Sequence, residues 1–312
     1  MRPAAHMLTQ RGVALVLVLW ALVLLTVIAG SFAYSMRTEA VLTQNLVATA
    51  QARARADGAA YLGIFELLKP MTDATKWKPD GKIHAWEAGE AKIRVVVTDE
   101  SGKIDLNAAS DALLKGLFQS AGLGEEDSTA LLDAVLDWRD ADDLRRPNGA
   151  EIADYVAAGS KYAPSNAPFK TLEELQQVKG MSPALYRKIH GALTIFSGQP
   201  GINPAFAPRQ ALLAIPGVEA AQVDAYIAQR QEYIDSDQPP PPFPFASGFA
   251  SAGSGSAYFL RVEVKLRNGG FFVREAVVRM AQDRKRPFQI LSWKEGDAVE
   301  QWLEPRVMDV SK

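Results

Sequence analysis

The chain has 312 residues, a formal net charge of −2 and no cysteine. This near-neutral balance excludes the overall basic field that is typical of nucleic-acid-binding proteins. The lack of cysteine excludes a disulfide framework. With 48% hydrophobic and 22% charged residues, the composition is that of a globular protein with room for one large or two modest domains.

The segment Val13–Tyr34 contains no charged residue. A helix rises about 1.5 Å per residue, so this segment can cross the hydrocarbon core of a bilayer, which is roughly 30 Å thick. We predict a transmembrane helix rather than a cleaved secretory signal, because the apolar part of a signal is normally shorter. Arg2 and Arg11 precede the span and Arg37 follows it. This bias favours a cytoplasmic N-terminus and a globular part on the other side.

The apolar helix is expected to continue beyond the membrane. No proline occurs between Arg37 and Lys69, and apolar residues recur there at helical spacing until Pro70. One helix from Val13 to about Lys69 would be about 85 Å long. Since its second half is amphipathic, that half must pack on another layer of the fold.

Four segments alternate between apolar and polar residues and predict strands. Asn268-Gly269-Gly270 between two of them is a hairpin signal. One long helix packed on one sheet is a two-layer α+β fold. The predicted strands are Ala91–Thr98, Tyr258–Leu266, Phe271–Met280 and Phe288–Trp293.

About 150 residues of helical character separate the first predicted strand from the last three. We interpret them as a helical domain inserted into the sheet domain. A linker, Asp235–Ser256, follows it and is rich in proline and then in glycine, serine and alanine. The best predicted helices are Leu131–Trp138, Thr171–Val178, Pro183–Leu193 and Ala220–Ile234.

Two turns in this block have the pattern of helix-hairpin-helix motifs, centred on Gly180 and Gly217. In DNA-binding versions the amide groups of the turn hold a phosphate beside basic residues. Lys179 lies beside the first turn, but Glu219 follows the second, and both turns lack the second glycine of phosphate-binding hairpins. The pattern therefore favours packing modules over nucleic-acid sites.

An acidic block lies between Asp99 and Asp154, where 14 acidic and 5 basic residues give a net charge of −9. Its densest parts are Asp137–Asp143 and Asn148–Glu151. Carboxylates clustered near a glycine suit a hard cation, above all Ca²⁺. The alternative is a set of helix-end charges that are neutralised by the arginines between them, and the residues alone leave both open.

Catalysis has little support in the sequence. His6, His84 and His190 lie far apart, and no nucleophile-elbow, zinc-protease or phosphate-binding-loop spacing occurs. We therefore expect a protein that is not an enzyme.

The chain resembles the K minor pseudopilin of the type II secretion system, the general secretion pathway protein K family. A polar leader that ends in glycine, a charge-free helix and a sheet behind it are features of type IV pilin-like proteins. The residues that carry the resemblance are Arg11–Leu15 with Leu19–Leu22, Asp99–Ala109, and Leu136–Asp140 through Pro147–Glu151.

The resemblance implies a type IV pilin-like α+β fold: a long N-terminal helix on a small antiparallel sheet, with a large inserted all-helical domain of the helix-hairpin-helix or SAM-like kind. The boundaries we expect are a leader at 1–12, a transmembrane half-helix at 13–34, pilin-like parts at 35–104 and 257–312, the inserted domain at 105–235 and the linker at 236–256.

The resemblance also implies processing of the N-terminus. Prepilin peptidase would cleave between Gly12 and Val13, and Val13 would be N-methylated. Most pilins carry glutamate at mature position five, where this chain has Leu17. A buried carboxylate is costly unless it is paired, and in pilins it pairs with the terminal amine of a neighbouring subunit. Its replacement by leucine suits the outermost place in a filament.

The implied function is that of a tip subunit, in the inner membrane with its globular part in the periplasm, that initiates and caps the pseudopilus for export of folded proteins. Its implied partners are minor pseudopilins I, J and H, prepilin peptidase and the inner-membrane assembly platform, with the exported protein or the outer-membrane secretin as further candidates. Members of the family hold structural calcium, and the ligands expected here are Asp140, Asp142, Asp143 and Glu151.

A pilin-like DNA-uptake protein of a competence system is the alternative function, motivated by the hairpin turns. The −9 block and the missing second glycines argue against it. A salt-dependent affinity for duplex DNA would revive it.

Overall fold

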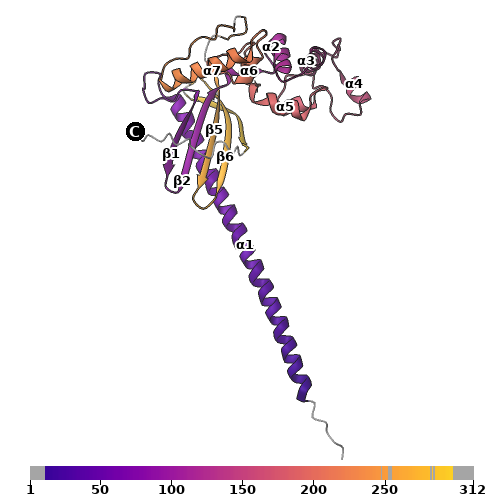
Figure 1. Cartoon of the computed structure of the whole chain (residues 1–312), viewed down its shortest axis with the longest axis vertical. Helices are drawn as coiled ribbons and strands as arrows, with labels where there is room; N and C mark the ends of the chain where they lie inside the picture. The colour runs from indigo at the N-terminus through magenta and orange to yellow at the C-terminus, as the bar shows by residue number, and fades with distance from the viewer. Residues whose placement is uncertain (1–10, 247, 252–254, 282, 284, 298–312) are drawn as a thin grey trace, which may run out of the picture.

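The computed structural model describes residues 11–246, 248–251, 255–281, 283 and 285–297. The predicted leader residues 1–10 and the C-terminal residues 298–312 lie outside the described residues. The chain forms one long helix, a five-stranded sheet beside the second half of that helix, and a helical unit above the sheet (Figure 1). The predicted α+β class and pilin-like architecture are confirmed.

Helix α1 runs without interruption over Arg11–Leu68, which are 58 residues. The predicted continuation of the membrane helix into the globular part is therefore correct. Pro70 ends the helix because it cannot continue the hydrogen-bond ladder. The ammonium of Lys76 donates to the carbonyls of Leu67 at 2.7 Å and Lys69 at 2.6 Å, where the end of a helix leaves acceptors unpaired.

The sheet is antiparallel throughout, in the order β1-β2-β5-β6-β7. Its core-facing side chains alternate along each strand, as the period of a half-buried strand requires. The strand bounds are β1 Asp80–Ala88, β2 Ala91–Asp99, β5 Ala257–Leu266, β6 Phe271–Met280 and β7 Phe288–Glu295.

Small residues let α1 lie close to the sheet. Ala52, Ala56 and Ala60 are fully buried, and each presents only a methyl group to the strands. At Gly63 even a methyl group would not fit, since a Cβ there would lie 2.8 Å from Cδ2 of Leu260. The buried aliphatic residues of β2 and β5 fill the space that these small side chains leave.

The helical unit leaves and re-enters the sheet through two adjacent strands. Asp99 ends β2 and pairs in register with Tyr258 of β5. The buried Asp99 carboxylate accepts hydrogen bonds from the amides of Ser101 at 2.8 Å and Gly255 at 2.9 Å. The outgoing and returning chains are thus joined at one point, and the insertion leaves the order of the strands unchanged.

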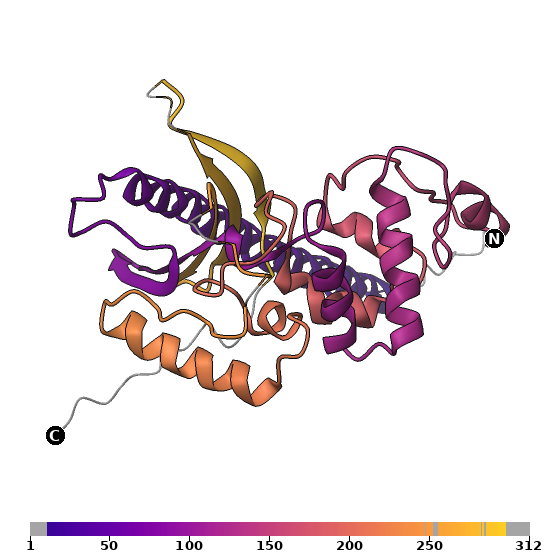
Figure 2. The ribbon, with the colours of Figure 1, turned by 90° about the horizontal axis from the view of Figure 1, so that it is seen from above.

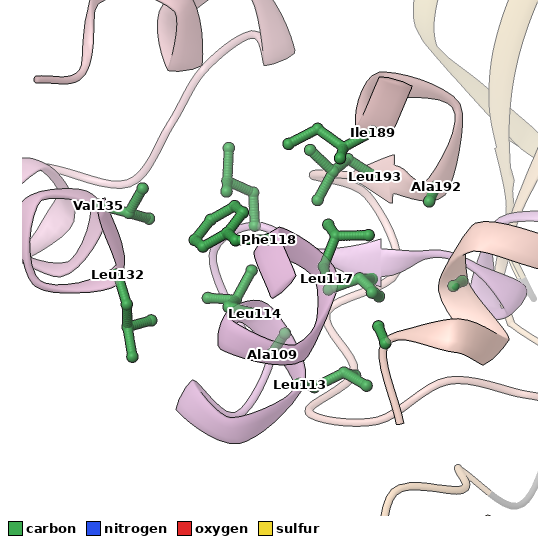
Figure 3. Close-up of a cluster of buried hydrophobic side chains, with 14 of the residues drawn as sticks. Ala109, Leu113, Leu114, Leu117, Phe118, Leu132, Val135, Ile189, Ala192 and Leu193 are labelled. Atoms are coloured by element: carbon green, nitrogen blue, oxygen red, sulfur yellow. The ribbon is translucent and has the colours of Figure 1, made fainter. Parts of the chain in front are cut away.

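The helical unit has a hydrophobic core of its own, separate from that of the sheet. Leu113, Leu114, Leu117 and Phe118 of α2 lie at its centre (Figure 3). A two-stranded parallel pair, β3 Ile104–Asp105 and β4 Leu193–Thr194, joins the start of the unit to the chain that follows α5. The helices are α2 Asp111–Ser120, α3 Glu125–Arg139, α4 Ile152–Ala157, α5 Pro183–Ile189, α6 Arg209–Leu213 and α7 Ala220–Asp235.

The structure differs from the sequence-based expectations in several places. Strand β1 had not been predicted. The helix expected at Thr171–Val178 is a 3₁₀ helix over Leu172–Gln177, and the one expected at Pro183–Leu193 ends as α-helix at Ile189. The chain that follows α7 packs on it: the rings of Tyr226 and Phe243 lie 4.7 Å apart, and Phe243 is buried.

An aromatic stack fixes β1 beside the loop that precedes it. The rings of Trp77 and His84 lie 3.9 Å apart and nearly parallel, at 6°. Burial lowers the pKa of His84 below its usual value of 6.5, against the smaller opposing effect of Asp80. Lys82 also lowers this pKa, and Glu66 raises it. The folded state therefore prefers neutral imidazole.

We predict that His84 contributes stability that is complete above about pH 6.5 and is lost as the pH falls through the lowered pKa. The measurement is urea unfolding of the wild type and of His84→Phe across this range. Phenylalanine keeps the stack on Trp77 and does not titrate. The difference in unfolding free energy should shift toward the variant at acidic pH, and a pH-independent difference would contradict the prediction.

Candidate functional site

One helix among the described residues is long and apolar enough to cross a membrane. Val13, the first residue of the predicted mature chain, and Leu17 both lie in this half of α1. Their side chains are 55% and 64% exposed, and the surrounding apolar residues are exposed in the same way. A half-helix that is apolar on all sides over this length fits a single-pass membrane anchor.

A second feature of α1 is a continuous uncharged side that faces away from the sheet, which we name the outward seam. Its residues recur every three or four positions and therefore lie on one side of the helix. All of them are exposed. The outward seam consists of Met36, Ala40, Thr43, Val47, Ala50, Ala54, Gly58, Tyr61, Phe65 and Leu68.

The charged residues of this part of α1 are turned toward the sheet. Arg55 donates to the carbonyl of Ala88 at 2.8 Å, and Asp57 pairs with Arg274 of β6 at 2.7 Å. The guanidinium of Arg53 lies 5.9 Å from the centre of the Phe272 ring. These contacts on the two flanks of the helix leave the seam between them free of charge.

The middle of the seam is shallow. Ala50, Ala54 and Gly58 succeed one another at four-residue intervals, and no atom lies within 4 Å of a Cβ built at Gly58. Tyr61 and Phe65, which are 51% and 60% exposed, stand above this depression. A small-residue surface of this kind lets a second helix approach closely.

The predicted metal-binding residues lie on the loop between α3 and α4. Arg146 spans this loop, with its guanidinium 3.4 Å from Asp137 and 3.7 Å from Asp140. Asp142 accepts from the amide of Leu144, and Asp143 accepts from the side chain of Asn166 at 2.7 Å. Each of the three predicted aspartates is therefore at least partly paired within the protein.

Glu151 differs from these aspartates. Glu151 is only 6% exposed, and both of its carboxylate oxygens are buried without a hydrogen-bond partner among the described residues. Oδ1 of Asp140 is buried without a partner there as well. Burial, followed by the charges of Asp137 and Asp140, raises the pKa of the Glu151 carboxyl above its usual range. Burial also raises the pKa of Asp140, with the charge of Asp142 adding to it.

Unpartnered carboxylate oxygens in an acidic environment fit a hard cation such as Ca²⁺, which takes oxygen ligands. In the conformation seen here, however, no three acidic or histidine side chains of the described residues are grouped so that they could hold a metal ion. The donor chemistry therefore fits calcium, whereas the loop does not bring the four predicted ligands together.

The two hairpin turns serve the core of the helical unit. Gly180 and Gly217 have φ values of +90° and +78°, which glycine adopts readily. The amide of Lys179 in the first turn donates to the hydroxyl of Tyr155 at 2.8 Å, so a protein group occupies the place of a phosphate oxygen. Val178 and Ile215, the residues before the turns, are 2% exposed. This geometry supports the packing interpretation.

One protein family matches a part of this chain. The family profile described as "Type II secretion system (T2SS), protein K" matches residues 93–198, which include the acidic loop and the first hairpin turn. The chain is similar to type II secretion system protein K, and the predicted resemblance is confirmed. These similarities support a minor pseudopilin role in type II secretion.

Two curated relatives carry the name type II secretion system protein K. The protein from Klebsiella pneumoniae is 29% identical over 230 residues, which cover 66% of this chain and 69% of the relative. The protein from Pseudomonas aeruginosa is 25% identical over 244 residues, 71% and 72% of the two chains.

A solved structure shares the fold. A chain of the GspK–GspI–GspJ complex from the type II secretion system of enterotoxigenic Escherichia coli aligns with a TM-score of 0.56 at 15% identity. The alignment covers 84% of this chain and 99% of that one. The family is a structural component of a secretion machine.

Sequence reasoning missed two residues of the acidic loop and its surroundings. Asp137 is fully buried below the loop and was left out of the predicted ligand set, although it begins the acidic run. Tyr155, which fills the first hairpin turn, had no sequence signal, because nothing in its local pattern indicates a partner 24 residues away.

Proposed function

We propose that this protein is a non-enzymatic subunit of the pseudopilus tip, which assembles with minor pseudopilins I, J and H to start and cap the filament for export of folded proteins across the outer membrane. It would be anchored in the inner membrane with its N-terminus cytoplasmic and its globular part periplasmic. Prepilin peptidase, the assembly platform, exported proteins and the outer-membrane secretin are the further partners of this proposal.

The outward seam of α1 is the observation that carries the proposal. An uncharged helix side extends from the membrane half to Leu68 and is exposed. Contact of this apolar surface with water is unfavourable, and its burial against another apolar helix would lower the free energy. At Gly58 a partner backbone can approach without displacing any atom of this chain. A chain solved together with its I and J partners has the same fold, which favours these subunits as occupants of the seam.

Filling the depression should block assembly without harm to the fold. We predict that Gly58→Leu weakens co-purification with the I and J subunits at least about tenfold, the equivalent of about 1.4 kcal/mol. The variant should be at least as stable as the wild type, because glycine costs about 1 kcal/mol in a helix interior. Thermal unfolding of the purified chain and recovery of the complex from membranes are the two measurements.

Two control variants make this test specific. Gly58→Ala should raise stability and retain the partners, since a methyl group barely fills the depression. Thr49→Leu places the same side chain nine residues earlier, half a turn round the helix from the seam, and should leave assembly unchanged. Equal loss of partners in Thr49→Leu and Gly58→Leu would contradict the seam as the assembly surface.

We further propose that prepilin peptidase cleaves after Gly12 and that Val13 is methylated. The polar leader before an uncharged helix supports this processing. Intact-mass and N-terminal peptide analysis of the protein from membranes, with and without the peptidase, should give a chain that begins at methylated Val13 only when the peptidase is present. A chain that begins at Met1 in both samples would contradict processing of this protein by prepilin peptidase.

Leu17 supports the placement at the tip. A subunit with glutamate at this position can pair with the terminal amine of a neighbour, whereas leucine offers no such partner. The helical unit, which extends above the sheet (Figure 1), would also obstruct the addition of another subunit there. Leu17→Glu is therefore expected to insert into the membrane and to leave export unchanged, and a strong gain or loss of export would count against the tip position.

Calcium is the third part of the proposal. Glu151 and Asp140 would hold the ion with Asp142 and Asp143, and it would neutralise carboxylate oxygens that are buried without a hydrogen-bond partner among the described residues. If binding is structural, chelator should lower the unfolding temperature of the wild type, and calcium should restore it. Glu151→Gln should abolish this difference. If chelator leaves the unfolding temperature of the wild type unchanged, the proposed structural calcium site is contradicted.

A further inference from the structure

Exposed large apolar side chains outside α1 are concentrated in one short segment. The described residues include eight of them, and four fall within residues 144–162. Leu144 is 78% exposed, Ile152 45%, Val156 68% and Tyr162 57%. We name these four residues the α4 patch. Single exposed apolar residues are ordinary on a protein surface, but a local concentration marks an interaction site.

Two contacts of this segment shape the loop of Leu144 and link it to α4. Ile152 and Val156 are one turn apart on α4 and share a side of it. Arg145, next to Leu144, pairs with Asp154 of α4 at 3.1 Å. The amide of Leu144 donates to the carboxylate of Asp142 at 2.9 Å, which turns the loop at that point.

The position of the patch separates it from the assembly seam. Helix α4 lies at the end of the helical unit opposite the sheet, and the membrane half of α1 extends from the other end of the molecule (Figure 1). Seen from above, α4 is again at the edge of the helical unit, beyond α3 (Figure 2). A helix packed on the outward seam would therefore leave this patch uncovered.

The charges around the patch select its partner. Residues 137–154 carry six acidic and three basic residues, a net charge of −3. The three basic residues are engaged within the protein: Arg139 with the carbonyl of Leu106, Arg145 with Asp154, and Arg146 with Asp137 and Asp140.

Asp142 and Asp143, next to Leu144, are exposed. A complementary surface is therefore apolar at its centre and basic at its rim. Anionic lipid would be repelled by the same charges, and the patch lies far from the membrane-spanning half of α1.

We propose that the α4 patch is a docking surface for a protein segment with an apolar side and a basic border, distinct from the surface on which other subunits assemble. Leu144 and Val156, the two most exposed members, are the anchors. The acidic rim orients the partner and favours its encounter. A bound calcium ion would reduce the rim charge and leave the apolar anchors in place, so the role of Leu144 and Val156 does not depend on the metal.

The direct test uses two designed helical peptides with the same leucine side, one with lysines and one with glutamates on the other side. Binding to the full-length protein in detergent is measured by fluorescence anisotropy, with calcium and with chelator. The lysine peptide should bind more tightly than the glutamate peptide in chelator. Leu144→Ser with Val156→Ser should weaken its binding at least tenfold in both conditions.

The control double variant is Met71→Ser with Ile290→Ser, which removes two exposed apolar side chains elsewhere on the surface. It should bind the lysine peptide as the wild type does. Equal weakening in both double variants, unchanged binding by Leu144→Ser with Val156→Ser, or tighter binding of the glutamate peptide in chelator would each overturn the proposal. Thermal unfolding of the patch variant should be unchanged, because Leu144 and Val156 are 78% and 68% exposed.

Export in cells separates this proposal from that of the seam. Leu144→Ser with Val156→Ser should reduce export while the I and J subunits are still recovered with the protein. Gly58→Leu, in contrast, should lose those subunits and still bind the lysine peptide. Normal export by the patch variant would overturn a role for the α4 patch in secretion, whatever the result for Gly58→Leu.

Discussion

The packing of α1 on the sheet is the constraint on which the rest of the structure depends. One helix must be apolar on all sides within the membrane and on one side only outside it, without a break between the two halves. Alanines and Gly63 on its inner side bring the helix axis close to the strands, while aliphatic side chains from the sheet supply the volume. Larger side chains on the helix would push the sheet away and expose the core.

This arrangement also explains the distribution of charge on α1. Arg53, Arg55 and Asp57 lie on its flanks, where they reach strand β6 and the end of β1. They fix the rotation of the helix about its own axis, because turning it would break these contacts and bury charge. The outward side is thereby left for uncharged residues, of which Tyr61 also contacts β7, with its ring 5.3 Å from that of Trp293.

The sequence was sufficient for those elements whose local pattern and tertiary role agree. Strand β6 runs over Phe271–Met280 as predicted, since a glycine turn precedes it and it is rich in aromatic and β-branched residues. The continuation of α1 was predictable because no proline interrupts it before Pro70. Strand β1 was missed because Asp80–Ala88 carries charged residues and a glycine and lies at the edge of the sheet, where one side of its backbone remains unpaired.

The site was less accessible than the fold. Local acidity identified the loop between α3 and α4, but the two unpartnered oxygens of Glu151 follow from burial under the folded chain. The same holds for the hydroxyl of Tyr155 in the hairpin turn. The outward seam is the side of α1 that the sheet leaves uncovered. In an alanine-rich helix the sequence pattern alone does not distinguish this side from the side that packs on the sheet.

The neck between β2 and β5 has an architectural consequence. Because Asp99 and Tyr258 are direct partners in adjacent antiparallel strands, a short hairpin turn could replace the entire helical unit without shifting either strand. The helix and sheet thus form a complete scaffold onto which a domain of nearly any size can be grafted at one junction. Variation in that domain can change what the end of the molecule presents while the filament-forming part stays the same.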